Sequence, residues 1–258
     1  MIEVHVAEYD SKDWQTLISK SHQTSLYVTP EWMAIHPHRC YIAYKGNNVA
    51  AGIVVNPGTH APYFIPYQGV LQLHKEDHKV VGAMLEAVQE DFDDPISVWN
   101  PPSLVDTRPF GWQWFTNKVL WTPTIKFTYF CTPASRMEPR ARANITGKQV
   151  EKTCDPGWFD EWKKEPWVGA LDEEIMERVL GFTSTECWTD GDGWVVWGTD
   201  LQDRGYYLAS VGKPTNVLAF LINECPSTDL VGCNSPQRAL FKRSFGGILR
   251  TYYGYRTA

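Results

Sequence analysis

The 258-residue sequence predicts a mixed α/β fold, in which sheets are flanked by helices. Short segments with alternating apolar and polar side chains recur along the chain, and amphipathic segments with helical spacing lie between them. Many of the helical segments begin with a cap residue or a proline. With 43% hydrophobic and 21% charged residues the chain has the composition of a folded protein, and its length suits one large or two small domains.

The first part of the chain opens with a strand over residues 2–6, where Ile and Val alternate with Glu and His. Asp10 or Ser11 caps a helix whose apolar residues share one face. Residues 40–44 and 49–55 predict a hairpin, because the residues between them tolerate positive φ. A helix over 76–92 and strands at 96–99 and 124–131 complete this part.

The second part continues the alternation of helices and strands. The pattern predicts helices at 157–164, 172–180 and 214–225, and strands at 185–189, 194–199 and 205–211.

The stretch 227–256 predicts a strand, a turn, a helix, a second turn and a final strand. Residues 229–231 form the first strand, Ser235 caps the helix, and Pro236 suits its first position because the missing N–H costs nothing there. Leu240, Phe241 and Phe245 are spaced to face inward. We therefore expect Lys242 and Arg243 at the exposed end of this helix, where cations suit the dipole.

This stretch also carries a family resemblance. Asp-Leu-Val-Gly-x-Asn at 229–234, Phe-Lys-x-x-Phe-Gly-Gly at 241–247 and the following Tyr-Tyr strand resemble the C-terminal signature of the Fem-type aminoacyltransferases and their GNAT-like relatives. A second match is Pro-Pro-x-Leu-x-Asp-x-Arg-Pro-Phe-x-Trp at 101–112. The long helical hairpin of some Fem proteins, proposed as a tRNA contact, has no counterpart in this sequence.

The resemblance implies two tandem GNAT-like halves with mixed sheets flanked by helices, at residues 1–131 and 132–258. It further implies an acyltransferase that moves an acyl or aminoacyl group to an amine and forms an amide bond. The acceptor stays open between a small molecule, a peptide and a cell-wall precursor. In some peptidoglycan-directed members Pro and an acidic residue follow the Pro-Tyr-x-Gly element, whereas this chain continues from 66–69 with Val-Leu-Gln-Leu, which speaks against a muropeptide acceptor.

The net charge of −6 conceals a segregation of charge. Residues 107–150 carry seven basic side chains and one acidic one, and residues 230–258 carry five basic side chains and no acidic one. The rest of the chain is therefore strongly acidic. Two cationic segments in an acidic protein indicate a local surface that binds anions, and the alternative is a solvated basic face without a ligand.

Neither a metal site nor a tightly bound cofactor is expected. The six cysteines form no Cys-x-x-Cys pair, and the histidines show no helical metal-binding spacing. The N-terminus lacks a basic region followed by an apolar run, and no window reaches ~18 uninterrupted apolar residues. We expect a cytoplasmic protein without a transmembrane segment, of open oligomeric state.

Lys242 and Asp106 are the candidate catalytic residues. The resemblance puts Lys242 close to the phosphate of the donor or to the oxyanion, and the plain alternative is a solvent-exposed lysine at a helix end. For Asp106 the alternative is an ion pair with Arg108 that fixes a loop. The candidate substrate-binding residues are Tyr67, Arg108, Arg140, Arg142, Tyr207, Asn234, Phe241 and Arg243. Among them the arginines would contact phosphate and the tyrosines would line the acceptor pocket.

Two donors compete as co-substrate. Ordinary GNAT proteins hold the pyrophosphate of acyl-CoA in a Gln/Arg-x-x-Gly-x-Gly/Ala loop at a helix start, and this chain has no good copy of that loop. The sequence therefore favours aminoacyl-tRNA over acyl-CoA. The alternatives are an acyl-CoA-dependent N-acyltransferase and a catalytically idle double-GNAT module that binds an anionic partner.

Overall fold

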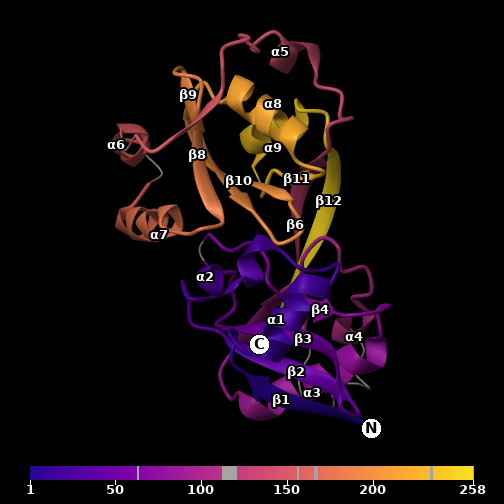
Figure 1. Cartoon of the computed structure of the whole chain (residues 1–258). Coiled ribbons are helices and arrows are strands. Elements are labelled where there is room, and N and C mark those ends of the chain that lie inside the picture. Colours follow the sequence, from indigo (N-terminus) through magenta and orange to yellow (C-terminus); the bar gives the residue numbers. More distant parts are fainter. Residues whose placement is uncertain (63, 112–120, 156, 166–167, 233–234, 258) are drawn as a thin grey trace. The chain divides into compact units, whose positions relative to one another are not determined.

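The chain forms two compact units in a computed structural model that describes residues 1–62, 64–111, 121–155, 157–165, 168–232 and 235–257 (Figure 1). The first unit comprises Met1–Lys126 and Thr251–Ala258, and the second comprises Phe127–Arg250. The chain enters the second unit within strand β6 (Thr122–Cys131) and returns within β12 (Ile248–Arg256). The units group residues by contact, so the expected repeat of two halves at 1–131 and 132–258 stays a prediction.

The first unit is an antiparallel sheet with helices on both faces. Its strands run in the order β1-β2-β3-β5-β12, and β4 also pairs with β3. Its other elements are β1 (Ile2–Ala7), α1 (Lys12–Lys20), η1 (Leu26–Val28), α2 (Pro30–Met33), β2 (Arg39–Lys45), β3 (Asn48–Pro57), β4 (Val70–Gln72), α3 (His78–Asp91), β5 (Ile96–Trp99) and α4 (Arg108–Gly111).

Alternation along β2 divides the first unit into two cores. Cys40 and Ile42 belong to the cluster beneath α1, whereas Tyr41 and Ala43 belong to the cluster beneath α3. Successive side chains of a strand point to opposite faces, so one strand can serve both cores. On the α1 face Gly52 leaves room for this helix, because a Cβ there would lie 2.7 Å from the side chain of Leu17.

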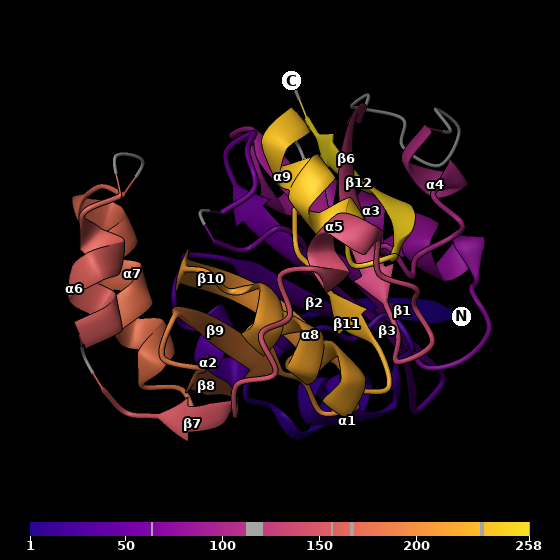
Figure 2. The same cartoon turned by 90° about the horizontal axis from the view of Figure 1, so that it is seen from above.

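The second unit is a mixed sheet with the strand order β6-β11-β10-β9-β8-β7. Its β10–β11 pair is parallel, and its β7–β8, β8–β9, β9–β10 and β6–β11 pairs are antiparallel. Helices α6 and α7 lie on one side of β8–β10, and α8 and α9 lie on the other side (Figures 1 and 2). The elements are α5 (Pro139–Arg142), β7 (Glu151–Thr153), α6 (Gly157–Lys163), α7 (Ala170–Leu180), β8 (Thr185–Thr189), β9 (Gly193–Thr199), β10 (Gly205–Gly212), α8 (Thr215–Glu224), β11 (Thr228–Asp229) and α9 (Pro236–Arg243).

The predicted mixed α/β fold, with sheets flanked by helices, is confirmed, and two details of its last stretch are corrected. The strand expected at 229–231 ends at Asp229, because Val231 has a left-handed φ of 44° that stops the extended backbone. Leu240 was expected to face inward, yet it is 58% exposed. Phe245, two residues after the end of α9, is buried in the core.

Among the described residues, no helix combines the length and the apolar character needed to cross a lipid bilayer.

Replacing Gly205 by Ala should destabilise the second unit by about 2 kcal/mol, since overpacking of a core typically costs 1–3 kcal/mol. A Cβ at this position would lie 2.0 Å from the buried ring of Trp197. The matched control is Gly111→Ala in α4, where a Cβ would meet no described atom within 4 Å. Urea unfolding of both variants measures the difference, and equal stabilities would contradict the close packing of Gly205.

Candidate functional site

Strands β10 and β11 diverge in the second unit and form a fork. They pair in parallel at two positions only, Gly205 with Thr228 and Tyr206 with Asp229. Beyond the second pair β10 continues to Gly212, whereas the chain after β11 turns at residues 230–232. In open α/β sheets ligands bind at the carboxyl ends of parallel strands where the chain directions separate. The fork is therefore the place in this unit where an extended ligand could be held.

The ammonium group of Lys242 holds the turn 230–232 by hydrogen bonds to its backbone. Its Nζ donates hydrogen bonds to the carbonyl oxygens of Leu230, Val231 and Gly232, the last at 2.7 Å. The residue is only 5% exposed. Hydrogen bonds from a charged donor are about twice as strong as neutral ones, so these contacts hold Val231 in its unfavourable backbone conformation.

The expected exposed position of Lys242 at the helix end is therefore wrong. Helix α9 begins at Ser235, whose hydroxyl accepts the N–H of Arg238 at 3.4 Å, and it ends against the turn that precedes it. Its last turn consequently directs Lys242 into the protein while Arg243 stays exposed. The sequence shows a lysine near a helix end, but it cannot show which way that end points.

Two aromatic rings accompany the ammonium group. Lys242 Nζ lies 5.2 Å from the centre of the Tyr207 ring, which permits a cation–π interaction. The Tyr207 hydroxyl is 2.5 Å from Ser210 Oγ, and burial raises the pKa of Tyr207. Phe241 is only half-buried and lies 6.4 Å from the Tyr207 ring, so it borders the site without anchoring the helix. Phe245 is the anchoring ring.

Asp229 occupies the apex of the fork and was not singled out from the sequence. Its side chain is 2% exposed, and its Oδ1 accepts the hydroxyl of Thr128 and the N–H of Val231, the latter at 2.8 Å. Its Oδ2 is buried and has no hydrogen-bond partner among the described residues. Burial raises the pKa of Asp229 to about 7, against the opposing effects of the Val231 N–H and the Lys242 charge. An aspartate within an apolar strand is the sequence signal that could have indicated it.

The junction between β10 and α8 is closed by an acidic turn. The N–H of Lys213 donates to the carbonyl of Asp192 at 3.0 Å, and a Cβ at Gly193 would lie 2.5 Å from the backbone of Lys213. The side chain of Asn216 donates to a carboxylate oxygen of Asp190 at 3.0 Å. The carboxylate of Asp192 is paired with Lys148 Nζ at 2.6 Å, so Asp190 is the carboxylate at this helix start that opposes the approach of another anion.

The basic residues of the second unit come together near α5. The Glu138 carboxylate binds Arg243 at 3.0 Å, and the Glu138 N–H donates to the Ser244 carbonyl at 2.8 Å. Helix α5 follows directly, so it carries the exposed Arg140 and Arg142 next to the end of α9 (Figure 2). The two basic segments of the sequence therefore meet within this unit.

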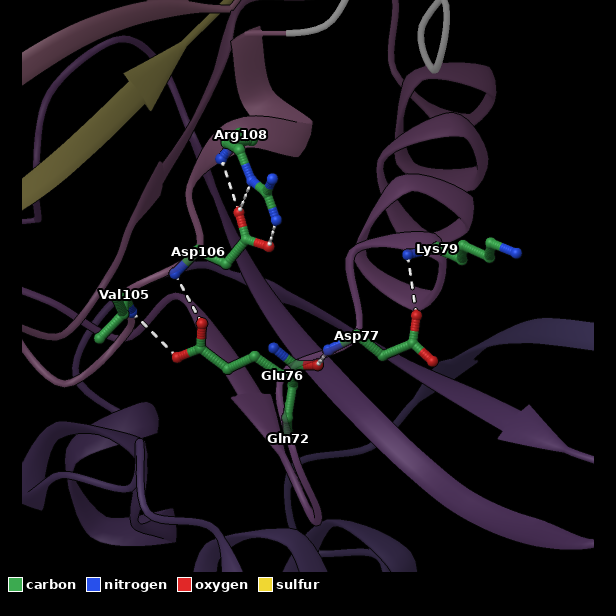
Figure 3. A network of polar contacts seen from close by, with 7 residues as sticks. All are labelled: Gln72, Glu76, Asp77, Lys79, Val105, Asp106 and Arg108. Carbon is green, nitrogen blue, oxygen red and sulfur yellow. Dashed lines mark hydrogen bonds and ion pairs between the residues drawn. The ribbon is translucent and has the colours of Figure 1, made fainter.

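Asp106 and Arg108 belong to the first unit and form a local network (Figure 3). The Arg108 guanidinium group donates one hydrogen bond to each carboxylate oxygen of Asp106, both at 2.8 Å. Glu76 in turn accepts the N–H groups of Val105 and Asp106, at 2.9 and 2.6 Å. Hydrogen bonds from Arg108 hold the pKa of Asp106 below its usual range, so this carboxylate is a weak base. The network has the geometry of the loop-fixing ion pair, and a catalytic role for Asp106 gains no support from it.

The remaining candidates are dispersed. Tyr67 is buried in the first unit between the rings of Tyr27 and Tyr252, and its hydroxyl has no hydrogen-bond partner in the described part of the chain. Asn234 lies outside the described residues. Within the described ranges, no group of three or more His, Cys, Asp or Glu side chains could hold a metal ion.

No protein-family model and no curated protein sequence matches the chain. Solved structures do match. FemX superimposes with a TM-score of 0.66 at 9% identity, over 97% of this chain and 96% of that one. The chain has the fold of FemX. A GNAT-family acetyltransferase from Colwellia psychrerythraea superimposes with a TM-score of 0.55 at 10% identity, over 99% of this chain and 100% of that one. A tandem GNAT protein from the clavulanic acid biosynthesis pathway superimposes with a TM-score of 0.52 at 12% identity, over 100% of this chain and 98% of that one. The Fem-like, double-GNAT fold implied by the sequence motifs is thereby confirmed.

Within this Fem-like fold, Lys242→Ala should lower the free energy of unfolding by about 3 kcal/mol. The change removes a charged donor and leaves three carbonyl oxygens of the turn 230–232 without it. Arg243→Ala is the matched control, because its exposed ion pair with Glu138 should contribute less than about 1 kcal/mol. Urea unfolding measures both, and a Lys242→Ala protein as stable as the control would contradict the buried position.

Asp229→Asn should stabilise the protein at alkaline pH and leave its stability unchanged below about pH 4. A carboxyl whose pKa is raised from 3.8 to about 7 on folding is neutral in both states at low pH. Between about pH 4 and 7 the unfolded state loses this proton while the folded state keeps it, which progressively costs the wild type up to about 4 kcal/mol. The difference in unfolding free energy between the two proteins, measured from pH 4 to 8, should therefore grow from about pH 4 to 7 and level off above about pH 7, where the carboxyl is ionised in both states. A constant difference would show that the Asp229 pKa is not raised.

Proposed function

We propose that this protein is an acyltransferase that moves an aminoacyl group from aminoacyl-tRNA to an amine and so forms an amide bond. The reaction class is supported by the fold shared with FemX and with GNAT acetyltransferases. It is also supported by the fork of β10 and β11, where the buried carboxyl of Asp229 projects to one face of the sheet and the buried ammonium group of Lys242 lies beside the ring of Tyr207 on the other.

The chemistry suits such a site because amide formation depends mainly on positioning and on charge stabilisation. The amine must be held in line with the acyl carbon, and the developing oxyanion must be stabilised. In this proposal Lys242 keeps the turn 230–232 in shape and supplies a positive charge beside the reacting carbonyl. Tyr207 borders the acyl group, and β10 beyond the fork offers backbone groups to an extended ligand.

The choice of donor rests on the closed junction between β10 and α8. Acyl-CoA proteins of this type need backbone N–H groups at a helix start to bind pyrophosphate. Here the Lys213 N–H is already bonded to the Asp192 carbonyl, and Asp190 and Asp192 lie alongside. A pyrophosphate would have to displace this turn and approach the carboxylate of Asp190. An aminoacyl ester brings no pyrophosphate to that position.

The phosphates of a tRNA would instead meet the basic surface near α5. Arg140, Arg142 and Arg243 are the residues we assign to it, since all three are exposed and closely grouped. Lys and Arg side chains that neutralise phosphates release counterions and make the affinity depend on salt. For Arg108, Tyr67 and Asn234 we retain the proposal of contacts with substrate, in which the acceptor is a small amine, a peptide or a cell-wall precursor.

Mass spectrometry of the products tests the proposal. The protein is incubated with triglycine as a peptide amine and either with tRNA charged with isotope-labelled amino acids or with acetyl-CoA. We expect a labelled aminoacyl adduct in the first mixture and no adduct in the second. A product from acetyl-CoA alone would overturn the choice of donor and favour an N-acetyltransferase. Salt-dependent tRNA binding without any product would instead identify a non-catalytic module.

A further inference from the structure

We propose that Asp229 is the proton acceptor of the transfer reaction and that its Oδ2 takes a proton from the attacking amine. This inference rests on the proposed function and adds to it the residue that serves as general base.

Asp229 has the position that this role requires. It pairs with Tyr206 in the last register position before β10 and β11 separate, so its side chain lies at the apex of the fork. Partners in a parallel pair project to the same face, and alternate residues project to opposite faces. Asp229 therefore shares a face with Tyr206, while Leu230 and Tyr207 project toward the α8 and α9 side, where both contact the core of the unit.

The two carboxyl oxygens are in different surroundings. Oδ1 is held by the Thr128 hydroxyl and the Val231 N–H, which fixes the orientation of the carboxyl group. Oδ2 is buried and has no hydrogen-bond partner among the described residues. A buried polar atom without a partner is rare and calls for a ligand or a proton to satisfy it. An amine that reaches the fork would be such a ligand, and it would bring a proton that Oδ2 can accept.

The proton and bond changes balance without any further reagent. An acceptor ammonium group gives one proton to Asp229 Oδ2 and becomes a neutral amine. The amine nitrogen attacks the ester carbonyl of the donor, the new C–N bond forms, and the C–O bond to the ribose breaks. The excess proton of the nitrogen passes to the ribose oxygen that leaves. The Asp229 proton returns to solvent when the products depart.

The electrostatic surroundings suit a base that works near neutral pH. Lys242 on α9 is the charged group whose field acts on Asp229, and it lowers the pKa of this carboxyl. Burial has the larger, opposite effect, and the result is a pKa of about 7. Of the neighbours on the other elements, Thr128 on β6 is uncharged, and the Tyr206 hydroxyl on β10 donates to Asp200. Catalytic acids and bases are most efficient when their pKa lies near the working pH.

The other partly or fully buried carboxylates of the site region are already engaged. Asp200 binds the guanidinium group of Arg204 at 2.7 Å, in addition to the Tyr206 hydroxyl. Asp190 accepts two backbone N–H groups and the side chain of Asn216. The oxygens of both groups thus already accept hydrogen bonds from the protein, unlike Asp229 Oδ2.

The test compares Asp229→Asn with Asp190→Asn, a matched replacement of a buried carboxyl outside the fork. Asparagine at 229 keeps the Oδ1 acceptor for Thr128 and Val231 but cannot accept a proton. Transfer from charged tRNA is measured from pH 5.5 to 8.5 with two acceptors, triglycine and hydroxylamine. Hydroxylamine is already unprotonated at neutral pH and does not need the base. Binding of charged tRNA and thermal melts are recorded for each variant.

For the wild type with triglycine we expect the rate to rise with pH and to level off with an apparent pKa near 7. Asp229→Asn should be slower by about a hundredfold or more, since general-base catalysis contributes at least that much. Its profile should lose the inflection near 7 and follow only the deprotonation of the triglycine amine at about pH 8. With hydroxylamine its defect should shrink to a few-fold. Asp190→Asn should retain the wild-type profile with both acceptors, and tRNA binding should be unchanged in both variants.

The outcomes separate the two proposals. A wild-type protein that transfers nothing to either acceptor overturns the proposed function, and the base with it. Wild-type transfer together with an Asp229→Asn variant that keeps both the wild-type rate and the inflection near pH 7 overturns the base alone. Equal defects of Asp229→Asn with both acceptors would also overturn it, because they would indicate a structural role.

Discussion

The interaction on which the second unit depends is the contact of the Lys242 ammonium group with the carbonyl oxygens of residues 230–232. It connects α9 to the end of β11 and compensates the left-handed backbone of Val231. The two strands separate where this turn begins and where β10 has an irregularity between Tyr207 and Ala209. A buried charge satisfied by the main chain costs stability unless every donor finds an acceptor.

The same turn determines the surroundings of Asp229. Its Val231 N–H is directed at Oδ1, and its carbonyls hold Lys242 near enough for the ammonium charge to act on the carboxyl. The carboxyl group is consequently buried and held in one orientation, and the Val231 N–H and the Lys242 charge offset part of the cost of ionising it. Perturbed groups of this type concentrate at functional sites because chemistry near neutral pH needs them, although structural networks produce them as well. The unpartnered Oδ2 distinguishes Asp229 from the fully engaged Asp200.

Much of the fold could be predicted from the sequence because its signals are local. Alternation in residues 2–6 and 40–44, the cap at Ser11 and the proline at 236 fix elements by their immediate neighbours. The motifs at 101–112 and 229–247 indicated the Fem-like fold that FemX shares. The site could be predicted only in part. Lys242 and Tyr207 were named, but the burial of Lys242 depends on the direction in which α9 packs, and the ion pair of Asp106 depends on how its loop closes on Glu76. The spacing of Asp106 and Arg108 allowed for the ion pair but could not decide between it and a catalytic role, and nothing in the spacing indicates the direction of α9.

Photo-crosslinking tests most directly whether the aminoacyl end of a tRNA lies in the fork. A tRNA charged with a photoreactive amino acid is irradiated with the protein, and the modified peptides are identified. The account predicts crosslinks to residues 205–212 or 228–232, lost when unlabelled charged tRNA is added in excess and retained when CoA is added. Crosslinks confined to the first unit, or crosslinks that CoA abolishes, would contradict it.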